Sequence, residues 1–446
     1  MQEFDLAQKV LNDILVNDVQ FNEALRKLFQ ADQSIRPLRG SVAGLVGCEL
    51  RHHLLFTHLV EEAKIEGLTE EEKMWIKLTL ADIYFFKRIP AEDMKKELLE
   101  KIGEEKMAKL EPLFAKAETP NEFIPAEFPK TSNKYLSLRY NTPEWVLKIW
   151  QHFGYGQTYH ILKANARQNT SSVRVRTSMV PVEEVLNSSP DFVKSPVEGI
   201  LLYGGKTPLR KLDLFKQSAI FAERMATKAM LDEYKIEEPK EAFIYNANAD
   251  SSLFKEIIET YQDKIGLNLG CPNTDNYTDV ARMIKTAGYK NINFFGAEPD
   301  SMEAAISRPQ DLVIAAPNSS NFDLIRDYPD YLLHFKKEEM DALFAQEKAV
   351  LEGCSKFVAE KGTLIYCVYT ISKKEGNKTI NDFLANHPEF HLIKEEQNMP
   401  FEEKATALYY AVLVKDTVAA KAEAPVGDIA SLADAPTNLL TASPKE

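Results

Sequence analysis

Residues 241–269 read EAFIYNANADSSLFKEIIETYQDKIGLNL. In this segment two short apolar runs flank a helical pattern. The runs at residues 242–245 and 265–269 have the length and the apolar character of buried strands. Residues 251–261, between them, predict a helix. Two strands joined by a helix form a right-handed crossover, so these strands are expected to lie parallel in one sheet.

The same alternation of apolar runs and helical segments continues along the C-terminal part of the chain. Further strands are expected at residues 292–295, 312–316, 363–368 and 409–414, and further helices at residues 278–287, 338–360 and 377–384. Repeated strand–helix units predict an α/β fold with a mostly parallel, Rossmann-like sheet that is covered on both faces. We assign this domain to residues 232–416 and expect any ligand beyond the carboxyl ends of its strands.

Residues 1–116 carry a different pattern, that of a small helical bundle. Phe4, Ala7 and Leu11 fall on one stripe at helical spacing. Thr69 followed by Glu72 predicts a capping box at the start of a later helix. The sequence therefore predicts an all-helical N-terminal domain.

Three further segments complete the organisation of the chain. Residues 117–133 contain three prolines among polar residues and predict a linker. Residues 134–231 predict a small mixed α/β domain, in which Val-Arg-Val-Arg at residues 173–176 alternates as a half-exposed strand would. Residues 417–446, rich in Ala, Pro, Ser and Thr, predict a disordered tail.

The composition narrows the classes of function. The formal net charge of −13 counts against RNA binding over a wide surface, because phosphate neutralisation supplies most of that affinity, yet it allows a local basic face. The sequence has no long apolar run and no signal-peptide pattern, so we expect a cytoplasmic protein without a membrane span. The four cysteines lack paired spacing, which argues against a disulfide framework or a metal site.

Several short motifs follow one another along the chain. They are LRYNTPEW (138–145), FGYG (153–156), VRVR (173–176), AERMAT (222–227), IRDYPD (325–330) and the block at residues 363–390. Their order and spacing resemble those of the Sun/Fmu-type small-subunit rRNA cytosine carbon-5 methyltransferases of the RsmB/NOP family. The resemblance implies a NusB-like helical domain, a small RNA-contacting domain and a Rossmann-like class I methyltransferase domain.

The catalytic positions that the resemblance implies hold unsuitable residues. Methylation of cytosine carbon 5 needs a thiolate that attacks carbon 6, because the ring carbon is not nucleophilic by itself. The family's nucleophilic and product-releasing cysteines would stand at Tyr369 and Asn318, and its base-contacting acid at Ala315. Cys367 lies two positions before Tyr369, on the same face of a continued strand, and is a substitute nucleophile only if it is not a buried core residue.

The cofactor positions that the resemblance implies have also changed. The family binds S-adenosylmethionine at a glycine-rich turn after the first strand, where bare backbone amides approach the ligand. The corresponding segment here, residues 243–253, contains no glycine. Asn268 aligns with the acid that holds the ribose, and Glu298 with a displaced acid after the third strand. The positions of this degenerate cleft are Asn246, Asn248, Asp250, Ser251, Asn268 and Glu298. We expect no cofactor to bind here, and S-adenosylmethionine only if the protein is active.

Basic residues in the motifs and in one short loop remain as candidate RNA contacts. These residues are Arg139, Arg174, Arg176, Lys206, Arg210, Lys211 and Arg326. We favour a catalytically inactive relative of the family that keeps a role in binding rRNA or a ribosome-assembly protein. A divergent but active S-adenosylmethionine-dependent methyltransferase and a protein-binding scaffold without RNA stay open as alternatives.

Overall fold

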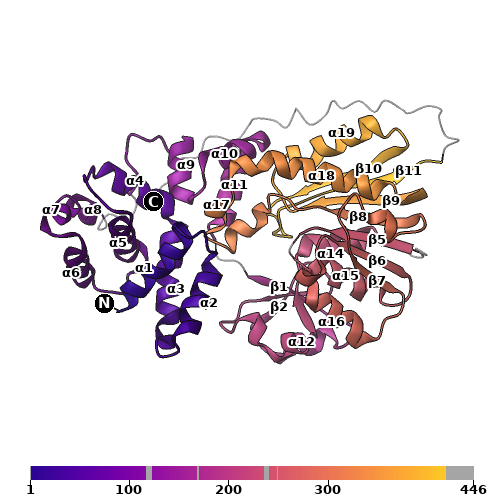
Figure 1. Cartoon of the computed structure of the whole chain (residues 1–446), viewed down its shortest axis with the longest axis horizontal. Coiled ribbons are helices and arrows are strands. Elements are labelled where there is room, and N and C mark those ends of the chain that lie inside the picture. The colour runs from indigo at the N-terminus through magenta and orange to yellow at the C-terminus, as the bar shows by residue number, and fades with distance from the viewer. Residues whose placement is uncertain (1, 117–122, 168–169, 236–240, 249, 418–446) are drawn as a thin grey trace, which may run out of the picture.

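A seven-stranded sheet forms the centre of the C-terminal domain (Figure 1). The computed structural model describes residues 2–116, 123–167, 170–235, 241–248 and 250–417. Along the sheet the strands follow the order β10-β11-β9-β8-β5-β6-β7. Their bounds are β5 Glu241–Asn246, β6 Gly266–Cys271, β7 Ile292–Gly296, β8 Gln310–Ala316, β9 Val358–Val368, β10 Phe390–Asn398 and β11 Leu408–Lys415. Neighbouring strands are parallel except at β11, which runs antiparallel to both β9 and β10.

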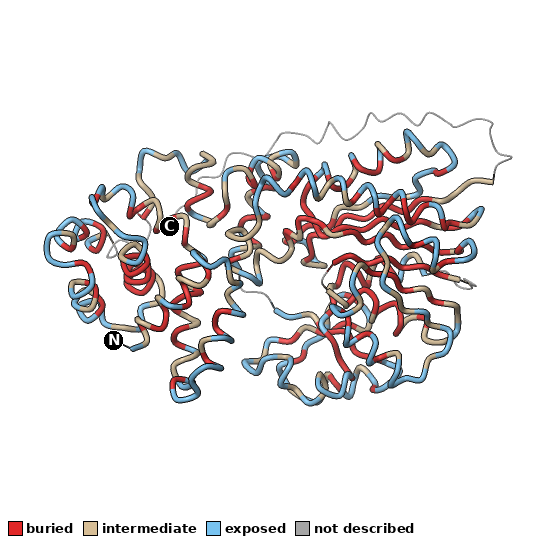
Figure 2. Tube along the Cα trace, viewed as in Figure 1, coloured by how far each residue is buried: buried red, intermediate tan, exposed pale blue. Residues whose placement is uncertain are grey.

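Helices cover both faces of this sheet, as the sequence predicts (Figure 1). One face packs against α14 (Met225–Glu233), α15 (Ser252–Tyr261) and α16 (Thr278–Ala287), and the other against α18 (Met340–Ser355) and α19 (Thr379–Asn386). The buried strands are the red centre of the domain in Figure 2. Burial of these apolar side chains supplies the main driving force for this fold. The Rossmann-like α/β prediction is therefore confirmed.

Two details of the predicted elements are wrong. The helix expected at residues 338–360 ends at Ser355, and β9 already begins at Val358. The edge strand β10 was not predicted, because its sequence, FHLIKEEQN, is mostly polar and does not form an apolar run. The strand is partly exposed in the structure.

Eight helices form the N-terminal part of the described chain. They are α1 Gln2–Leu15, α2 Phe21–Ala31, α3 Arg39–Arg51, α4 His53–Glu62, α5 Glu70–Ala81, α6 Ala91–Ile102, α7 Glu104–Ala108 and α8 Glu111–Lys116. The predicted stripe of Phe4, Ala7 and Leu11 is fully buried in their common core. The predicted capping box is present, with the Glu72 backbone N–H donating to the Thr69 hydroxyl.

Two smaller units lie between the bundle and the large sheet. Helices α9 (Asn133–Tyr140), α10 (Glu144–Trp150) and α11 (Tyr155–Asn165) share a hydrophobic core with Phe322 and Ile371 of the C-terminal domain. A four-stranded antiparallel sheet of order β2-β3-β1-β4 has its own core. Its elements are β1 Ser171–Val175, α12 Val182–Ser188, β2 Phe192–Lys194, β3 Ile200–Tyr203, α13 Asp213–Lys216 and β4 Ile220–Ala222.

Polar contacts join the helical bundle to the rest of the protein. The Phe21 backbone N–H donates to the Asp330 carboxylate at 2.7 Å. The Asn141 side chain bridges the α3–α4 corner, accepting from the Leu54 N–H and donating to the Leu50 carbonyl. These contacts bring the bundle, α9 and the segment 325–330 to one junction.

Some expectations fall on parts of the chain that the structure leaves out. Most of the predicted tail, residues 418–446, and residues 117–122 of the predicted linker lie outside the described residues. Within the described residues, no helix combines the length and the apolar character that a membrane crossing needs.

Candidate functional site

The turn that follows β5 is held together by its own amide side chains. Asn246 Oδ1 accepts from the backbone N–H and the side-chain amide of Asn248, at 3.1 and 3.2 Å. Asn246 Nδ2 donates to the Asp250 carbonyl at 2.9 Å. The Tyr277 hydroxyl donates to the backbone carbonyls of both asparagines. With Asn246 1% and Asn248 3% exposed, the predicted cofactor turn is filled by side chains of the protein itself.

Asp250 and Ser251 form hydrogen bonds at the start of helix α15. The Asp250 carboxylate accepts from the Ser252 backbone N–H at 2.8 Å, and the Ser251 hydroxyl donates to Asp279 at 2.8 Å. Asp250 also pairs with the Arg224 guanidinium. Desolvation is the largest influence on Asp250 and alone would raise its pKa, but the charge of Arg224 and the hydrogen bonds from Ser252 and Arg224 together lower that pKa below its ordinary value. Asp250 therefore remains a carboxylate.

Asn268 and Glu298 lie away from this turn. Asn268 stands in the middle of β6, which continues to Cys271, and its amide donates to the Gln310 side chain at the start of β8. The strand continues for two residues beyond the apolar run that ends at residue 269, so Asn268 does not stand at its carboxyl end, where the resemblance implies the ribose-binding acid. Glu298 follows β7 and is exposed to solvent.

Tyr369, which stands at the family's nucleophile position, is buried directly after β9. Its hydroxyl lies 3.0 Å from the Thr227 hydroxyl. The Arg224 guanidinium carbon lies 4.1 Å from the centre of the Tyr369 ring, a cation–π geometry. Burial raises the pKa of the Tyr369 phenol above its usual value, so the phenol is protonated at neutral pH.

Arg224 contacts both the Tyr369 ring and two carboxylates. Besides Asp250, its guanidinium binds Asp323, with Nε donating to Oδ2 at 2.6 Å. We call Arg224, Asp250, Asp323 and Tyr369 the Arg224 cluster. Arg224, Asp250 and Asp323 line a pocket of about 460 Å³, while Tyr369 lies beneath Arg224. Because the charges of the cluster pair with one another, they stabilise a closed arrangement of this edge of the sheet.

The other two catalytic positions lie apart from this cluster. Ala315 packs into the core under α18, on the face of the sheet opposite to Tyr369. Asn318 follows β8 and is half-buried. Neither side chain carries a thiol or a carboxylate, so the roles of base contact and product release have no counterpart at these positions.

Cys367 shares the sheet face of Tyr369, as the alternation of the strand predicts. The thiol is 2% exposed, and burial raises its pKa to about 12. A thiol with that pKa holds almost no thiolate at neutral pH, and the thiolate is the nucleophile. The environment of Cys367 is therefore that of an inert core residue.

Two of the predicted RNA contacts are structural instead. Arg174 Nε binds both carboxylate oxygens of Glu256, at 2.8 and 3.1 Å, and Arg176 Nε binds Glu259 at 3.1 Å. All four side chains are at most 8% exposed. Strand β1 is therefore buried against α15 rather than half-exposed. Their prediction as RNA contacts is corrected, because these guanidiniums join the small sheet to the large domain.

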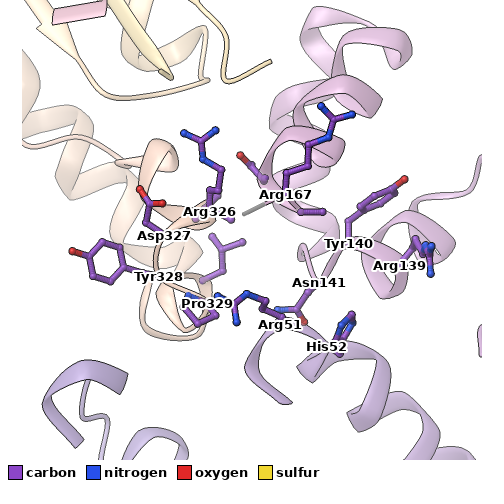
Figure 3. Close-up of a pocket in the computed structure, with 14 residues that line it drawn as sticks. Arg51, His52, Arg139, Tyr140, Asn141, Arg167, Arg326, Asp327, Tyr328 and Pro329 are labelled. Atoms are coloured by element: carbon purple, nitrogen blue, oxygen red, sulfur yellow. The ribbon is translucent and has the colours of Figure 1, made fainter. Parts of the chain in front are cut away.

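The remaining predicted RNA contacts fall into two groups. Lys206, Arg210 and Lys211 are exposed in the loop and short turn after β3. Arg139 and Arg326 line a different pocket, of about 500 Å³, where the bundle, α9, α11 and the segment 325–330 meet (Figure 3).

Sequence reasoning missed three arginines. Arg51 and Arg167 line the pocket in Figure 3, and Arg224 binds the two carboxylates of its cluster. Arg224 lies inside the motif AERMAT, so its place in a segment that resembles the family was a usable signal. Arg51 and Arg167 carry no such local signal, because their neighbours in the pocket come from distant parts of the chain.

Solved structures support the fold as a whole. The structure of PH0851 aligns with a TM-score of 0.72 over 92% of this chain and 99% of that chain, at 18% identity. NSun6 from Pyrococcus horikoshii, solved with SFG, aligns with a TM-score of 0.54 over 62% of this chain and 98% of that chain, at 12% identity. The C-terminal domain therefore has a Rossmann-like α/β fold.

Curated relatives match a smaller part of the sequence. The Ribosomal RNA small subunit methyltransferase B of Xanthomonas campestris pv. campestris is 27% identical over 119 residues, 24% of this chain and 27% of that protein. The protein of the same description from Vibrio vulnificus is 30% identical over 110 residues, 23% of this chain and 26% of that protein. The chain thus matches about a quarter of each relative's length, and no family model matches. The matches confirm the resemblance to the Sun/Fmu-type rRNA methyltransferases that the sequence motifs predict.

Proposed function

We propose that this protein is a catalytically inactive relative of the rRNA cytosine carbon-5 methyltransferases that binds RNA without methylating it. One observation carries the proposal. The position of the nucleophile holds a buried, protonated phenol, Tyr369, under the guanidinium of Arg224. A phenol in this state does not attack a pyrimidine ring, and Arg224 and its two carboxylates close the space in front of it.

The cofactor cleft supports the same proposal, because its residues do not fit S-adenosylmethionine. Two backbone N–H groups of this turn already donate within the protein, that of Asn248 to the Asn246 side chain and that of Ser252 to the Asp250 carboxylate. Tyr277 closes the same turn from the side of β6. Asp250 adds a negative charge, which would repel the carboxylate of that ligand.

The RNA-binding part of the proposal rests on exposed and pocket-lining basic residues. Lys206, Arg210 and Lys211 are open to solvent, and Arg139 and Arg326 line one pocket. The curated relatives are described as enzymes of ribosomal RNA, which favours rRNA as the ligand class over an unrelated protein. The scaffold alternative makes the opposite prediction, that RNA does not bind.

Two measurements on the full chain test the proposal. Isothermal titration with S-adenosylmethionine should give no heat of binding at cellular ligand concentrations, while unmodified small-subunit rRNA should be retained in a binding assay. A tritiated methyl-transfer assay on the same rRNA should show no incorporation. Methyl transfer that disappears in a Cys367→Ala variant would reveal a relocated nucleophile and overturn the inactive assignment.

A further inference from the structure

The pocket at the junction of the domains concentrates positive charge in a protein of net charge −13. Four arginines line it, Arg51 from the end of α3, Arg139 from the end of α9, Arg167 after α11, and Arg326 from the segment 322–326. Asp327 is the one carboxylate among the lining residues. Figure 3 shows Arg167 and Arg326 on facing walls, with Arg51 lying below them.

Two polar donors in this pocket have no partner within the described part of the chain. They are Arg326 Nε and Asn165 Nδ2, both buried from solvent. A buried donor without an acceptor costs about 1–3 kcal/mol, so an occupant that supplies oxygen atoms would relieve this cost at two places. Among the described residues, none of the four guanidiniums forms an ion pair with a carboxylate in the way that Arg174 and Arg224 do.

Helix ends explain part of this arrangement. Arg51 and Arg139 end their helices, and Arg167 follows the end of α11, where positive charge offsets the partial negative charge of the carbonyl end. Arg326 has no such explanation, because burial lowers its pKa and its Nε is unpartnered. His52 reports the local potential, since burial and the charges of Arg139 and Arg51 lower its pKa to about 4.

We propose that this pocket binds phosphate groups of single-stranded RNA. Guanidinium groups fit phosphate oxygens in pairs of hydrogen bonds, and four of them around about 500 Å³ can hold adjacent backbone phosphates. The aromatic residues Tyr140 and Tyr328 also line it, and Tyr328 is 43% exposed. Exposed aromatic rings beside a basic groove are the usual platform for unpaired bases.

The position of the pocket links this proposal to the closed catalytic centre. Arg326, Asp327 and Tyr328 line both this pocket and the one that contains the Arg224 cluster. An RNA strand held by Arg326 would therefore pass in front of Tyr369 without meeting a nucleophile. This inference rests on the proposed RNA-binding function and gives it a site.

The test compares two matched double variants of the full chain. Arg51→Gln/Arg167→Gln removes two exposed pocket charges, and Lys348→Gln/Lys356→Gln removes two exposed charges from α18 and the residue directly after it, a pair that we call the α18 variant. Binding of a labelled unstructured RNA of about twelve nucleotides is measured by fluorescence anisotropy at several salt concentrations. The pocket variant should bind the RNA roughly tenfold more weakly. The slope of log K against log salt concentration should become shallower by about 1.4, or about 0.7 for each lost phosphate contact. The α18 variant should stay within about twofold of the natural protein, and melting temperatures check that both variants fold.

Each alternative outcome has a distinct meaning. RNA binding that both double variants retain equally would overturn the pocket while leaving the proposed RNA-binding function in place. A natural protein that binds no RNA would overturn the proposed function itself. Displacement of the RNA by inorganic pyrophosphate at equal phosphate concentration would assign the pocket to a free phosphate ligand and overturn the RNA assignment.

Discussion

Arg224 covers the ring of Tyr369, with its guanidinium carbon 4.1 Å from the ring centre, and it binds Asp323 at 2.6 Å. One side chain thus covers the ring at the position where the resemblance implies a nucleophile and pairs with two carboxylates. These contacts form an ion-pair cluster, and the cluster has measurable consequences for stability.

Replacing Arg224 by methionine should destabilise the protein. Asp323 is 8% exposed, and removal of its partner leaves a buried charge without compensation, which costs about 3 kcal/mol. Burial already raises the pKa of Asp323, so the variant should also take up a proton near neutral pH. Urea unfolding followed by circular dichroism measures the loss. The double variant Arg224→Met/Asp323→Asn should recover part of it, and equal losses in the single and double variants would contradict the pairing.

Restoring the nucleophile alone should not restore catalysis. In a Tyr369→Cys variant the new thiol would still lie behind Arg224, and the cofactor turn would still be filled by Asn246 and Asn248. Losing the buried ring also leaves a cavity, which should cost about 3 kcal/mol. Tritiated methyl transfer to unmodified small-subunit rRNA should stay at background. Incorporation above background would mean that the cofactor binds despite the altered turn.

Most strands of the large sheet can be predicted from the sequence, and the reason is physical. The central parts of β5, β8 and β9 are buried on both faces, so each of these strands contains an apolar run that can be recognised without knowledge of its neighbours. Strand β10 is at the edge of the sheet and partly exposed, and its polar residues HLIKEEQ hide it. Asn268 was misplaced for a related reason, because β6 continues through Gly270, which no apolar pattern signals.

Charged residues are harder to assign from sequence, because their roles depend on partners far away in the chain. Arg174 alternates with valines like a surface residue, yet Glu256, 82 positions later, draws it into a buried pair. Arg51 and Arg167 show the opposite case. No local sequence pattern marks them as candidate RNA contacts, and they line one pocket only because three segments fold together. The absence of a thiol at Tyr369, by contrast, can be read from the sequence without any three-dimensional context.

The corrected role of Arg174 can be separated from RNA binding by stability. Arg174→Met leaves Glu256 buried without its partner and should lower the free energy of unfolding by about 3 kcal/mol. Arg139→Met, at an exposed position, should change it by less than about 0.5 kcal/mol. Chemical denaturation of the two variants side by side checks both values. A mild effect of Arg174→Met would return this arginine to the list of candidate RNA contacts.

A buried carboxyl pair should make stability depend on pH. Glu347 on α18 is fully buried next to Glu375, which accepts from the Ser320 N–H at 2.7 Å and from the Thr370 hydroxyl at 2.5 Å. Burial, with the charge of Glu375, raises the pKa of Glu347 from 4.5 to about 11. The folded protein therefore keeps a proton that the unfolded chain releases above pH 4.5. Stability should fall as pH rises from 4.5 towards 11.

Glu347→Gln removes this dependence, because glutamine has a similar shape and cannot ionise. The melting temperature of the variant, relative to the natural protein, should rise steadily between about pH 5 and pH 9, because each pH unit in this range costs the natural protein about 1.4 kcal/mol of stability. Differential scanning fluorimetry over this range measures the shift. Glu338→Gln, at an exposed position shortly before α18, is the matched control and should follow the natural protein at every pH. If the two variants behave alike, the folded protein does not keep a proton on Glu347.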